Sequence, residues 1–238
     1  MRLASLISGG GTTMEAIGKA CKSGEIPFEL ACVISSNSDA GGIQKAKKIG
    51  LSPKDILVIN PKDFREEGKI NHEKFGEAIL SELKARKVDV VLQNGWYPRT
   101  PDSVTDAYRG MIFNQHPGPL PEFGGRGMFM GPVHAAVLEF RKLTRGELWT
   151  EVVAQRVERD MDAGAVVKSA RVEILPGDTP EILQQRALPF EHRVQIELLK
   201  DIANGSVHEV TRPSMVLPGE EEILEKAKRK AIAMYPEG

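Results

Sequence analysis

Two polar side chains that could do chemistry stand two residues apart in the middle of this sequence. Asn114 and His116 follow the apolar run 110–113 and precede a turn-forming stretch, Pro-Gly-Pro-Leu-Pro, at 117–121. Residues two apart in a strand project to the same side, so the carboxamide and the imidazole can point at one position. A neutral donor beside a titratable donor can stabilise an oxyanion as it forms. The same spacing also fits a strand end with two polar residues in solvent.

A glycine-rich turn near the N-terminus has the composition of an anion-binding loop. Three glycines at 9–11 follow the apolar run 3–8 and precede a helical pattern that begins at Thr12. Glycines let the backbone approach a ligand closely, and the free N–H groups at a helix N-terminus favour negative charge. Thr12 and Thr13 add hydroxyl donors. A tight turn without a ligand is the alternative interpretation.

Two well-known phosphate motifs do not fit this loop. A P-loop requires Gly-Lys followed by Ser or Thr, and the stretch 8–13 contains no lysine. A dinucleotide site has a third glycine where this chain has Met14, and an acid at the end of the second strand, which here ends in Ser-Ser-Asn at 35–37. The loop therefore predicts a monophosphate or similar anion and disfavours a dinucleotide-dependent oxidoreductase.

An acidic turn in the second half supplies a candidate partner for the imidazole. Asp160 and Asp162 lie in the turn 159–164 between two strand patterns. Aspartates in turns commonly bond to their own backbone, and that explanation suits Asp160. Asp162 becomes chemically relevant if the fold brings it close to His116, because a nearby carboxylate raises the pKa of an imidazole.

The other histidines and the two cysteines suggest no metal site. None of the histidines makes an i, i+4 pair or an H-E-x-x-H pattern, and we expect His134 and His192 to be packing or surface residues on helices. Cys21 and Cys32 are too few for a disulfide framework or a zinc knuckle. They are expected to be buried small hydrophobes in a reducing compartment.

Composition limits the classes of partner. The chain has 238 residues, 41% hydrophobic and 27% charged, and its 32 basic and 33 acidic residues give a net charge of -1. This balance offers no electrostatic attraction for a nucleic acid. The sequence lacks a run of 18 apolar residues, so no membrane span is expected. Its N-terminus is typical of a first strand rather than a signal peptide, and we expect a cytoplasmic protein.

Alternating strand and helix patterns predict an α/β fold. The first half predicts a parallel sheet wrapped by helices, and the second half predicts an antiparallel strand pair followed by a long helix that Pro189 is expected to kink. We therefore expect a single Rossmann-like domain with a mostly parallel twisted sheet. The expected strands are 3–8, 28–34, 55–58, 88–92, 111–113, 150–158 and 165–174, and the expected helices are 12–22, 40–49, 72–87, 180–204 and 219–234.

Several motifs occur together in the order seen in one enzyme family. They are Ser-Gly-Gly-Gly-Thr at 8–12, Ser-Asn-Ser-Asp-Ala at 36–40, Asn114-x-His116-Pro117, Asp162-x-Gly164, Asp178-Thr179 and Glu191-His192. In this combination the chain resembles the phosphoribosylglycinamide formyltransferase family, the folate-dependent one-carbon transferases of purine synthesis. The resemblance covers roughly residues 1–205. It implies a formyltransferase domain over 1–205, with a phosphate-binding N-terminal half and a folate-binding, catalytic C-terminal half, and an extension with a short helix over 206–238.

The resemblance also implies roles for individual residues. Asn114 and His116 would hold the tetrahedral oxyanion, His116 as a protonated general acid, and Asp162 would raise its pKa and order a proton-relaying water. The ribose phosphate would bind Gly10, Gly11, Thr12 and Thr13, its sugar hydroxyls would contact Glu191, and the formyl donor 10-formyltetrahydrofolate would contact Arg65, Tyr97, Pro98, Arg99, Thr100 and Asn114. The implied partners are this folate and a phosphorylated amine, with no metal, nucleic acid or membrane. The sequence leaves a homodimer open.

Departures from the family pattern leave other amines open as substrates. The chain has Thr13 where the family usually has Asn, a Val-Ala-Gln strand ending at Gln155 instead of Thr-Val-His, and altered segments at 94–99, 118–121 and 124–130. An aminosugar nucleotide is one alternative, and a non-catalytic folate- or nucleotide-binding module is another. Aminoacyl-tRNA is disfavoured, because the tRNA-directed relatives carry a further C-terminal domain and this chain has no basic excess.

Overall fold

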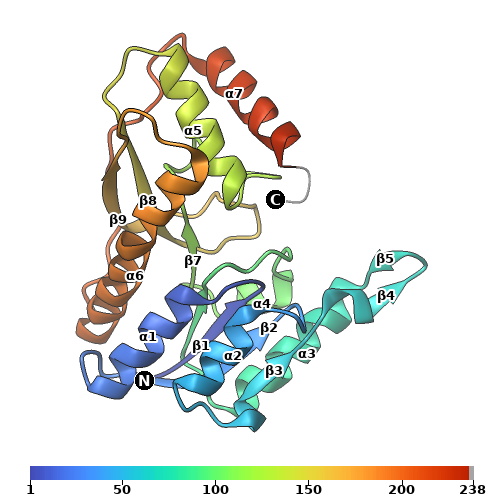
Figure 1. The fold of residues 1–238 in the computed structure, drawn as a ribbon. Coiled ribbons are helices and arrows are strands. Elements are labelled where there is room, and N and C mark those ends of the chain that lie inside the picture. The colour runs from blue at the N-terminus through green and yellow to red at the C-terminus, as the bar shows by residue number, and fades with distance from the viewer. Residues whose placement is uncertain (236–238) are drawn as a thin grey trace.

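The computed structural model describes residues 1–235, which form a seven-stranded sheet with helices on both faces (Figure 1). The sheet order is β3-β2-β1-β6-β7-β8-β9, and β4 and β5 make a separate hairpin. The strands are β1 (Arg2–Ile7), β2 (Glu29–Ser35), β3 (Ile56–Val58), β4 (Arg65–Glu66), β5 (Lys69–Ile70), β6 (Val90–Gln93), β7 (Ile112–His116), β8 (Trp149–Arg156) and β9 (Val166–Glu173). The α-helices are α1 (Thr12–Ser23), α2 (Gly41–Lys48), α3 (His72–Ala85), α4 (Asp102–Ala107), α5 (Gly131–Leu143), α6 (Pro180–Asn204) and α7 (Glu221–Met234).

One strand of the sheet, β8, runs opposite to the other six. The pairs β2–β3, β1–β2, β1–β6 and β6–β7 are parallel, whereas β7–β8 and β8–β9 are antiparallel. The predicted α/β fold, a mostly parallel sheet with an antiparallel pair in the C-terminal half, is therefore confirmed. The strand that carries Asn114 and His116 has a parallel neighbour on one side and an antiparallel neighbour on the other.

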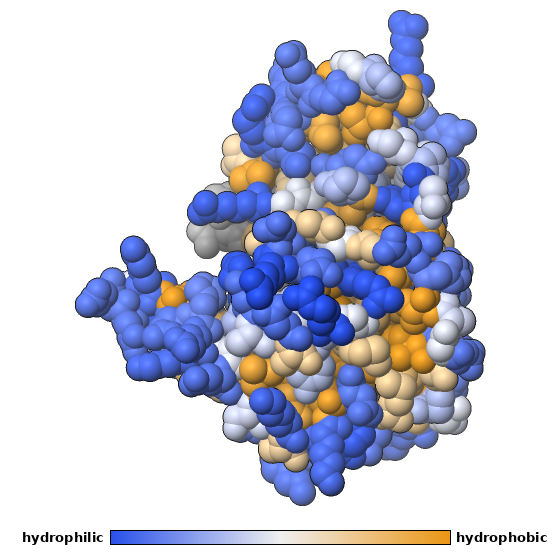
Figure 2. Space-filling model, turned by 180° about the vertical axis from the view of Figure 1, so that it is seen from behind, coloured by the Kyte–Doolittle hydropathy of each residue, from blue (hydrophilic) through white to orange (hydrophobic). Residues whose placement is uncertain are grey.

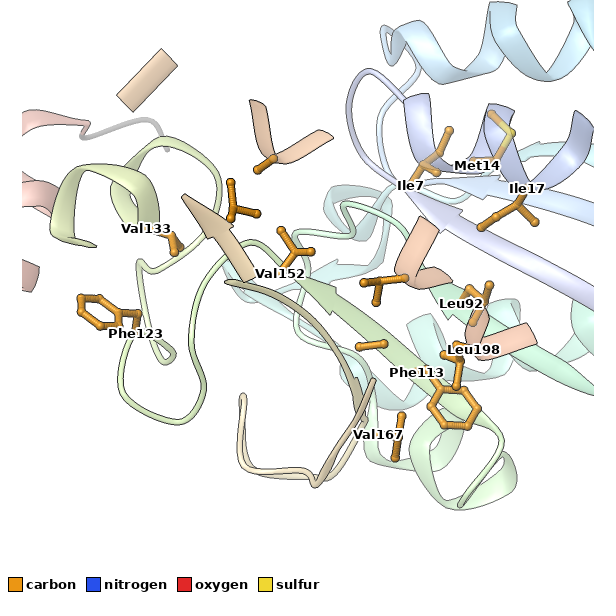
Figure 3. Close-up of a cluster of buried hydrophobic side chains, with 14 of the residues drawn as sticks. Ile7, Met14, Ile17, Leu92, Phe113, Phe123, Val133, Val152, Val167 and Leu198 are labelled. Carbon is orange, nitrogen blue, oxygen red and sulfur yellow. The ribbon is translucent and has the colours of Figure 1, made fainter. Parts of the chain in front are cut away.

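Two apolar layers cover the sheet, because side chains along a strand alternate between its faces. On β1, Leu3 and Ile7 belong to the cluster that contains Met14 of α1, whereas Leu6 belongs to the cluster that contains Phe75 of α3. Figure 3 shows part of the first cluster, with side chains from strands and helices in one continuous apolar layer. This layer fixes α1 and α6 on one face of the sheet, and the second cluster fixes α3 on the other.

The C-terminal helix α7 belongs to the same core. It lies beside α5 (Figure 1), and its Ala227 and Ala231 are fully buried in the cluster that contains Val133 and Phe140 of α5. The helix predicted over 219–234 is confirmed as α7. Its predicted apolar stripe is also confirmed, since Ile223 and Leu224 pack against the same cluster.

The structure differs locally from the sequence predictions. The strand expected to end at Phe113 continues to His116, because β8 pairs with residues 113–116. The short helix α4 was not predicted, and neither was the hairpin of β4 and β5, whose strands have two residues each. Helix α6 contains Pro189 in its interior. A kink at that proline stays a prediction.

The β4–β5 hairpin projects from the body of the molecule (Figure 1). Seen from behind, this projection is mostly hydrophilic (Figure 2). Antiparallel pairing of Arg65 with Ile70 and of Glu66 with Lys69 forms it. Among residues 1–235, no helix is both long and apolar enough to cross a membrane.

Gly164→Ala is expected to destabilise the fold, whereas Gly41→Ala serves as a matched control. A Cβ on Gly164 would lie 1.8 Å from the backbone oxygen of Arg156 in β8, so the turn 159–164 would have to move. A Cβ on Gly41 meets only an ordinary contact at 3.9 Å. Overpacking of this kind costs about 1–3 kcal/mol. Urea unfolding measures it, and equal stability of the two variants would contradict the close approach.

Candidate active site

A cavity of about 520 Å³ lies at the carboxyl ends of β1, β6 and β7. In open α/β sheets this edge is where ligands bind. The cavity wall is formed by the triglycine loop, the segment after β6, the loop 125–130, the turn 159–162 and one face of α6. The structure brings nearly all sequence-predicted site residues to this wall, namely Gly10, Gly11, Thr12, Thr13, Tyr97, Pro98, Arg99, Thr100, Asn114, His116, Asp162 and Glu191.

Arg65 is the exception among the predicted site residues. It is exposed on β4, in the projecting hairpin, and is not part of the cavity wall. The hairpin carries it away from the carboxyl ends of the strands (Figure 1). Arg65 therefore lies outside the cavity wall, and its contact with the folate stays a prediction.

Three carboxamides stand in one row across the sheet at the cavity. Asn114 of β7 is paired with Gln93 of β6 on one side and with Gln155 of β8 on the other, and paired residues of neighbouring strands project to the same face. The Gln93 amide donates to the Thr100 hydroxyl at 2.6 Å, and the Gln155 amide donates to Asp162 at 2.7 Å. Within the described residues the Asn114 side chain makes no hydrogen bond. The amides of Gln93 and Gln155 are thus hydrogen-bonded within the protein, and the Asn114 amide is available to a ligand.

His116 is buried and oriented by a backbone carbonyl. Its Nε2 lies 3.0 Å from the oxygen of Phe123, and because a carbonyl oxygen can only accept, Nε2 must carry the hydrogen. Phe123 is itself fully buried and packs edge-on against Phe140. This contact fixes the ring, so Nδ1 is the nitrogen that can gain or lose a proton.

Burial and charge act on His116 in opposite directions. Burial lowers the pKa of His116 below its ordinary value, and this effect outweighs the upward influence of the Asp162 carboxylate on the same pKa. Lys228 of α7 also lowers it. The free protein therefore favours the neutral imidazole, which differs from the protonated form implied by the family resemblance. The physical reason is that the ring is 3% exposed and its positive charge loses hydration.

Asp162 joins β8 to the loop 125–130. Its Oδ1 accepts from the Gln155 amide at 2.7 Å, and its Oδ2 accepts from the backbone N–H of Gly125 at 2.9 Å. The close packing of Asp162 against the backbone at position 124 requires a glycine there, since a Cβ on Gly124 would lie 2.7 Å from the Cβ of Asp162. The carboxylate thus holds a wall of the cavity in addition to acting on His116.

Glu191 is a buried acid with a neutral partner. It lies on α6 at 6% exposure and accepts a hydrogen bond from the Gln115 amide. Burial raises the pKa of Glu191 to about 7. Near neutrality the carboxyl therefore exists in both forms, and it can accept from or donate to a hydroxyl group of a ligand.

The triglycine loop brings two helix N-termini together. Gly11 has a left-handed backbone (φ 64°) at the start of α1, and the N–H of Gly42 in α2 donates to the oxygen of Gly9 at 3.0 Å. A Cβ on Gly11 would lie 2.6 Å from the Cα of Gly42, so only glycine permits this packing. The first-turn N–H groups of both helices lack intrahelical partners and favour an anion nearby.

An aromatic pair covers another part of the cavity. Tyr97 follows β6, and its ring centroid lies 5.4 Å from that of Phe129 in the loop 125–130. A Cβ on Gly9 would lie 2.9 Å from the Tyr97 oxygen, which places the phenol against the triglycine loop. Tyr97 therefore connects the triglycine loop with the loop 125–130.

Two residues of the site had been assigned no role from the sequence. His134 of α5 is fully buried, as expected of a packing residue, and it also borders the cavity; among the described residues neither ring nitrogen has a partner. Burial, with a smaller effect of His116, lowers the pKa of His134 to about 4. Gln155 was noted only as a departure from the family. Its contact with Asp162 depends on strand register, which no local signal reveals. Across residues 1–235, no three His, Cys, Asp or Glu side chains are grouped to hold a metal ion.

Glu191→Gln is expected to remove a pH-dependent loss of stability. The wild-type carboxyl titrates near pH 4.5 when unfolded and near 7 when folded. Between these values the folded state binds more protons, so stability falls as pH rises and levels off above about pH 7. The variant should be more stable than wild type by up to about 3 kcal/mol at about pH 8 and similar at about pH 4. Urea unfolding at both pH values tests this, and a pH-independent difference would contradict it.

Comparisons with known proteins agree with this geometry. The formyl transferase family profile matches residues 1–199. The chloroplastic phosphoribosylglycinamide formyltransferase of Arabidopsis thaliana is 30% identical over 87% of this chain, which spans 66% of that relative, and the enzyme of Haemophilus influenzae is 29% identical over 86% of this chain and 88% of its own length. The crystal structure of glycinamide ribonucleotide transformylase 1 from Symbiobacterium toebii matches with a TM-score of 0.75 at 31% identity, covering 86% of this chain and 88% of that chain. The chain belongs to the formyl transferase family.

Proposed function

We propose that this protein transfers a formyl group from 10-formyltetrahydrofolate to the amine of 5'-phosphoribosylglycinamide, a step of purine biosynthesis. The observation that carries the proposal is the convergence of Asn114, His116 and Asp162 on one cavity that also contains the triglycine loop. The Haemophilus influenzae relative, covered over 88% of its length at 29% identity, bears the name of this activity, and so does the longer Arabidopsis thaliana relative at 30% identity. The proposal places the protein in the cytoplasm.

The triglycine loop is the proposed site for the ribose phosphate. Backbone N–H groups of the loop and of the first turn of α1 donate to the phosphate oxygens, and the hydroxyls of Thr12 and Thr13 add donors. Gly10 leaves open space on its Cβ side, where no atom lies within 4 Å. Glu191, at the same cavity, then contacts the sugar hydroxyls.

The segment after β6 is the proposed site for the folate ring. Residues 97–100 line the cavity, and the Tyr97–Phe129 pair offers an apolar surface to a planar ring. Arg99 is already paired with Asp102 at 2.6 Å, which orients its guanidinium. This arrangement brings the formyl group of the folate toward Asn114.

The chemistry follows from the free amide and the buried imidazole. The substrate amine attacks the formyl carbon, a C–N bond forms, and the carbonyl oxygen becomes negative. The Asn114 amide and protonated His116 hold this oxygen. A proton then passes from the former amine to N10 of the folate, the bond from the formyl carbon to N10 breaks, and tetrahydrofolate leaves. Positioning, electrostatics and proton transfer carry the reaction.

Protonation of His116 requires negative charge nearby, since burial opposes it. Asp162 supplies one such charge. The substrate phosphate and the developing oxyanion add two more, and each favours the imidazolium. In this proposal the imidazole is neutral in the free protein and gains its proton as the charged substrate binds.

Asn114→Ala and His116→Ala are each expected to lower turnover by about 10²–10³-fold, the usual cost of losing one oxyanion donor. Tetrahydrofolate binding should stay near the wild-type value for Asn114→Ala, because this donor acts mainly in the transition state. Steady-state kinetics with 5'-phosphoribosylglycinamide measure the turnover of each variant. The same measurement on the wild-type protein with an aminosugar nucleotide tests which amine is the substrate. Near-normal turnover of a variant would show that its substituted residue is not part of the mechanism. A higher turnover with the aminosugar nucleotide would contradict the proposed amine substrate.

Asp162→Asn is expected to shift the pH profile of turnover to lower pH. Removing the carboxylate lowers the pKa of His116 further, and activity that requires the imidazolium then declines at lower pH than in wild type. Asp63→Asn is the control, because it removes a charge from an exposed residue that lies outside the cavity wall. The dependence of kcat on pH measures the effect. A profile that superimposes on that of wild type would exclude the tuning role.

A further inference from the structure

The helix α7 lies beyond the part of the chain that the family profile matches. The match ends at residue 199, whereas α7 spans 221–234. The helix packs along α5, which begins directly after the loop 125–130 (Figure 1). The C-terminal segment therefore lies against the outer side of an element that forms the cavity wall.

Two side chains at the end of α7 contact this loop and the start of α5. A Cβ on Gly127 would lie 3.2 Å from the Cδ1 atom of Ile232, and a Cβ on Gly131 would lie 3.0 Å from the ring of Tyr235. Both glycines thus let the loop approach α7 closely. The Tyr235 hydroxyl donates to Glu181 of α6 at 2.9 Å, whereas the contact with Gly131 is made by the ring itself.

The inner side of the same loop belongs to the site. Residues 125–130 line the cavity, Phe129 packs on Tyr97, and the N–H of Gly125 donates to Asp162. The loop is therefore held between site residues on one side and α7 on the other.

The backbone of the loop needs such support. Gly125 and Gly127 have positive φ values of 99° and 80°, and Met130 has φ 53°, a conformation that non-glycine residues rarely adopt. Glycines also leave a free loop many alternative conformations. Contacts from outside must select the conformation that forms the cavity wall, and Ile232 and Tyr235 supply them.

We propose that Ile232 and Tyr235 are positioning residues that hold the loop 125–130 and the start of α5 in their cavity-forming conformation and thereby set the affinity for the formyl donor. The effect on activity rests on the proposed function. The donor is the affected substrate because the loop carries Phe129 of the aromatic pair, which suits a planar ring rather than a phosphate.

The test compares Ile232→Ala and Tyr235→Ala with two controls. Tyr235→Phe keeps the ring against Gly131 and loses only the hydroxyl bond to Glu181. Lys230→Ala removes an exposed ion pair with Glu139, 2.7 Å long, from the same helix. Thermal unfolding of each variant establishes that it folds, and kinetics are compared between folded proteins only.

Two readouts separate the proposal from a general loss of stability. Amide hydrogen exchange of residues 125–131, measured without ligand, should accelerate about tenfold in the two main variants and stay at the wild-type rate in the controls. The KM for 10-formyltetrahydrofolate should rise about tenfold with a smaller change in kcat, and Tyr235→Phe should retain the wild-type KM.

Each result has a definite meaning. Unchanged exchange in both main variants would overturn the positioning role, and faster exchange with an unchanged KM would overturn its link to donor affinity. Because amide hydrogen exchange is measured on the free protein, it tests the contact between the loop and α7 even if no formyl transfer is found. A failure of the proposed activity is seen separately, as a wild-type protein that transfers formyl to none of the amines.

Discussion

The carboxylate of Asp162 is the contact on which the site depends. One oxygen accepts from Gln155 of β8 and the other from the backbone of Gly125, so a single side chain joins the antiparallel half of the sheet to the loop over the cavity. Charge-assisted hydrogen bonds of this kind are shorter and stronger than neutral ones. The same charge is the largest influence that raises the pKa of His116. Loop geometry and imidazole charge are therefore linked through one group.

Low solvent exposure decides the charge states around this contact. Burial lowers the pKa of both His116 and His134, and it raises that of Glu191 to about 7. All three groups are thus biased toward neutrality in the free protein, because a low dielectric disfavours isolated charge. In the proposed function, a phosphorylated substrate brings negative charge to this environment and favours the protonated form of His116.

The wall of the cavity is assembled from segments far apart in the chain. The triglycine loop, Tyr97, Phe129 and the end of α7 form a continuous series of contacts, from the helix N-termini of the first half to the last described residues. Glycines at 9, 127 and 131 permit each close approach. The C-terminal helix is therefore part of the architecture of the site as well as of the apolar core.

The sequence by itself determined the alternation of strands and helices, the glycine-rich turn between the first strand and helix, and the two-residue spacing of Asn114 and His116, because periodicity and turn chemistry are local properties. It also determined the acidic turn that holds Asp162. Only the tertiary structure decided that Gln155 stands opposite Asn114, that His134 is buried beside the cavity, and that Arg65 lies outside it. Strand register, burial and the packing of α7 on a distant loop depend on contacts between remote segments. No local pattern encodes them, and the pKa values that follow from burial could not be predicted before those contacts were known.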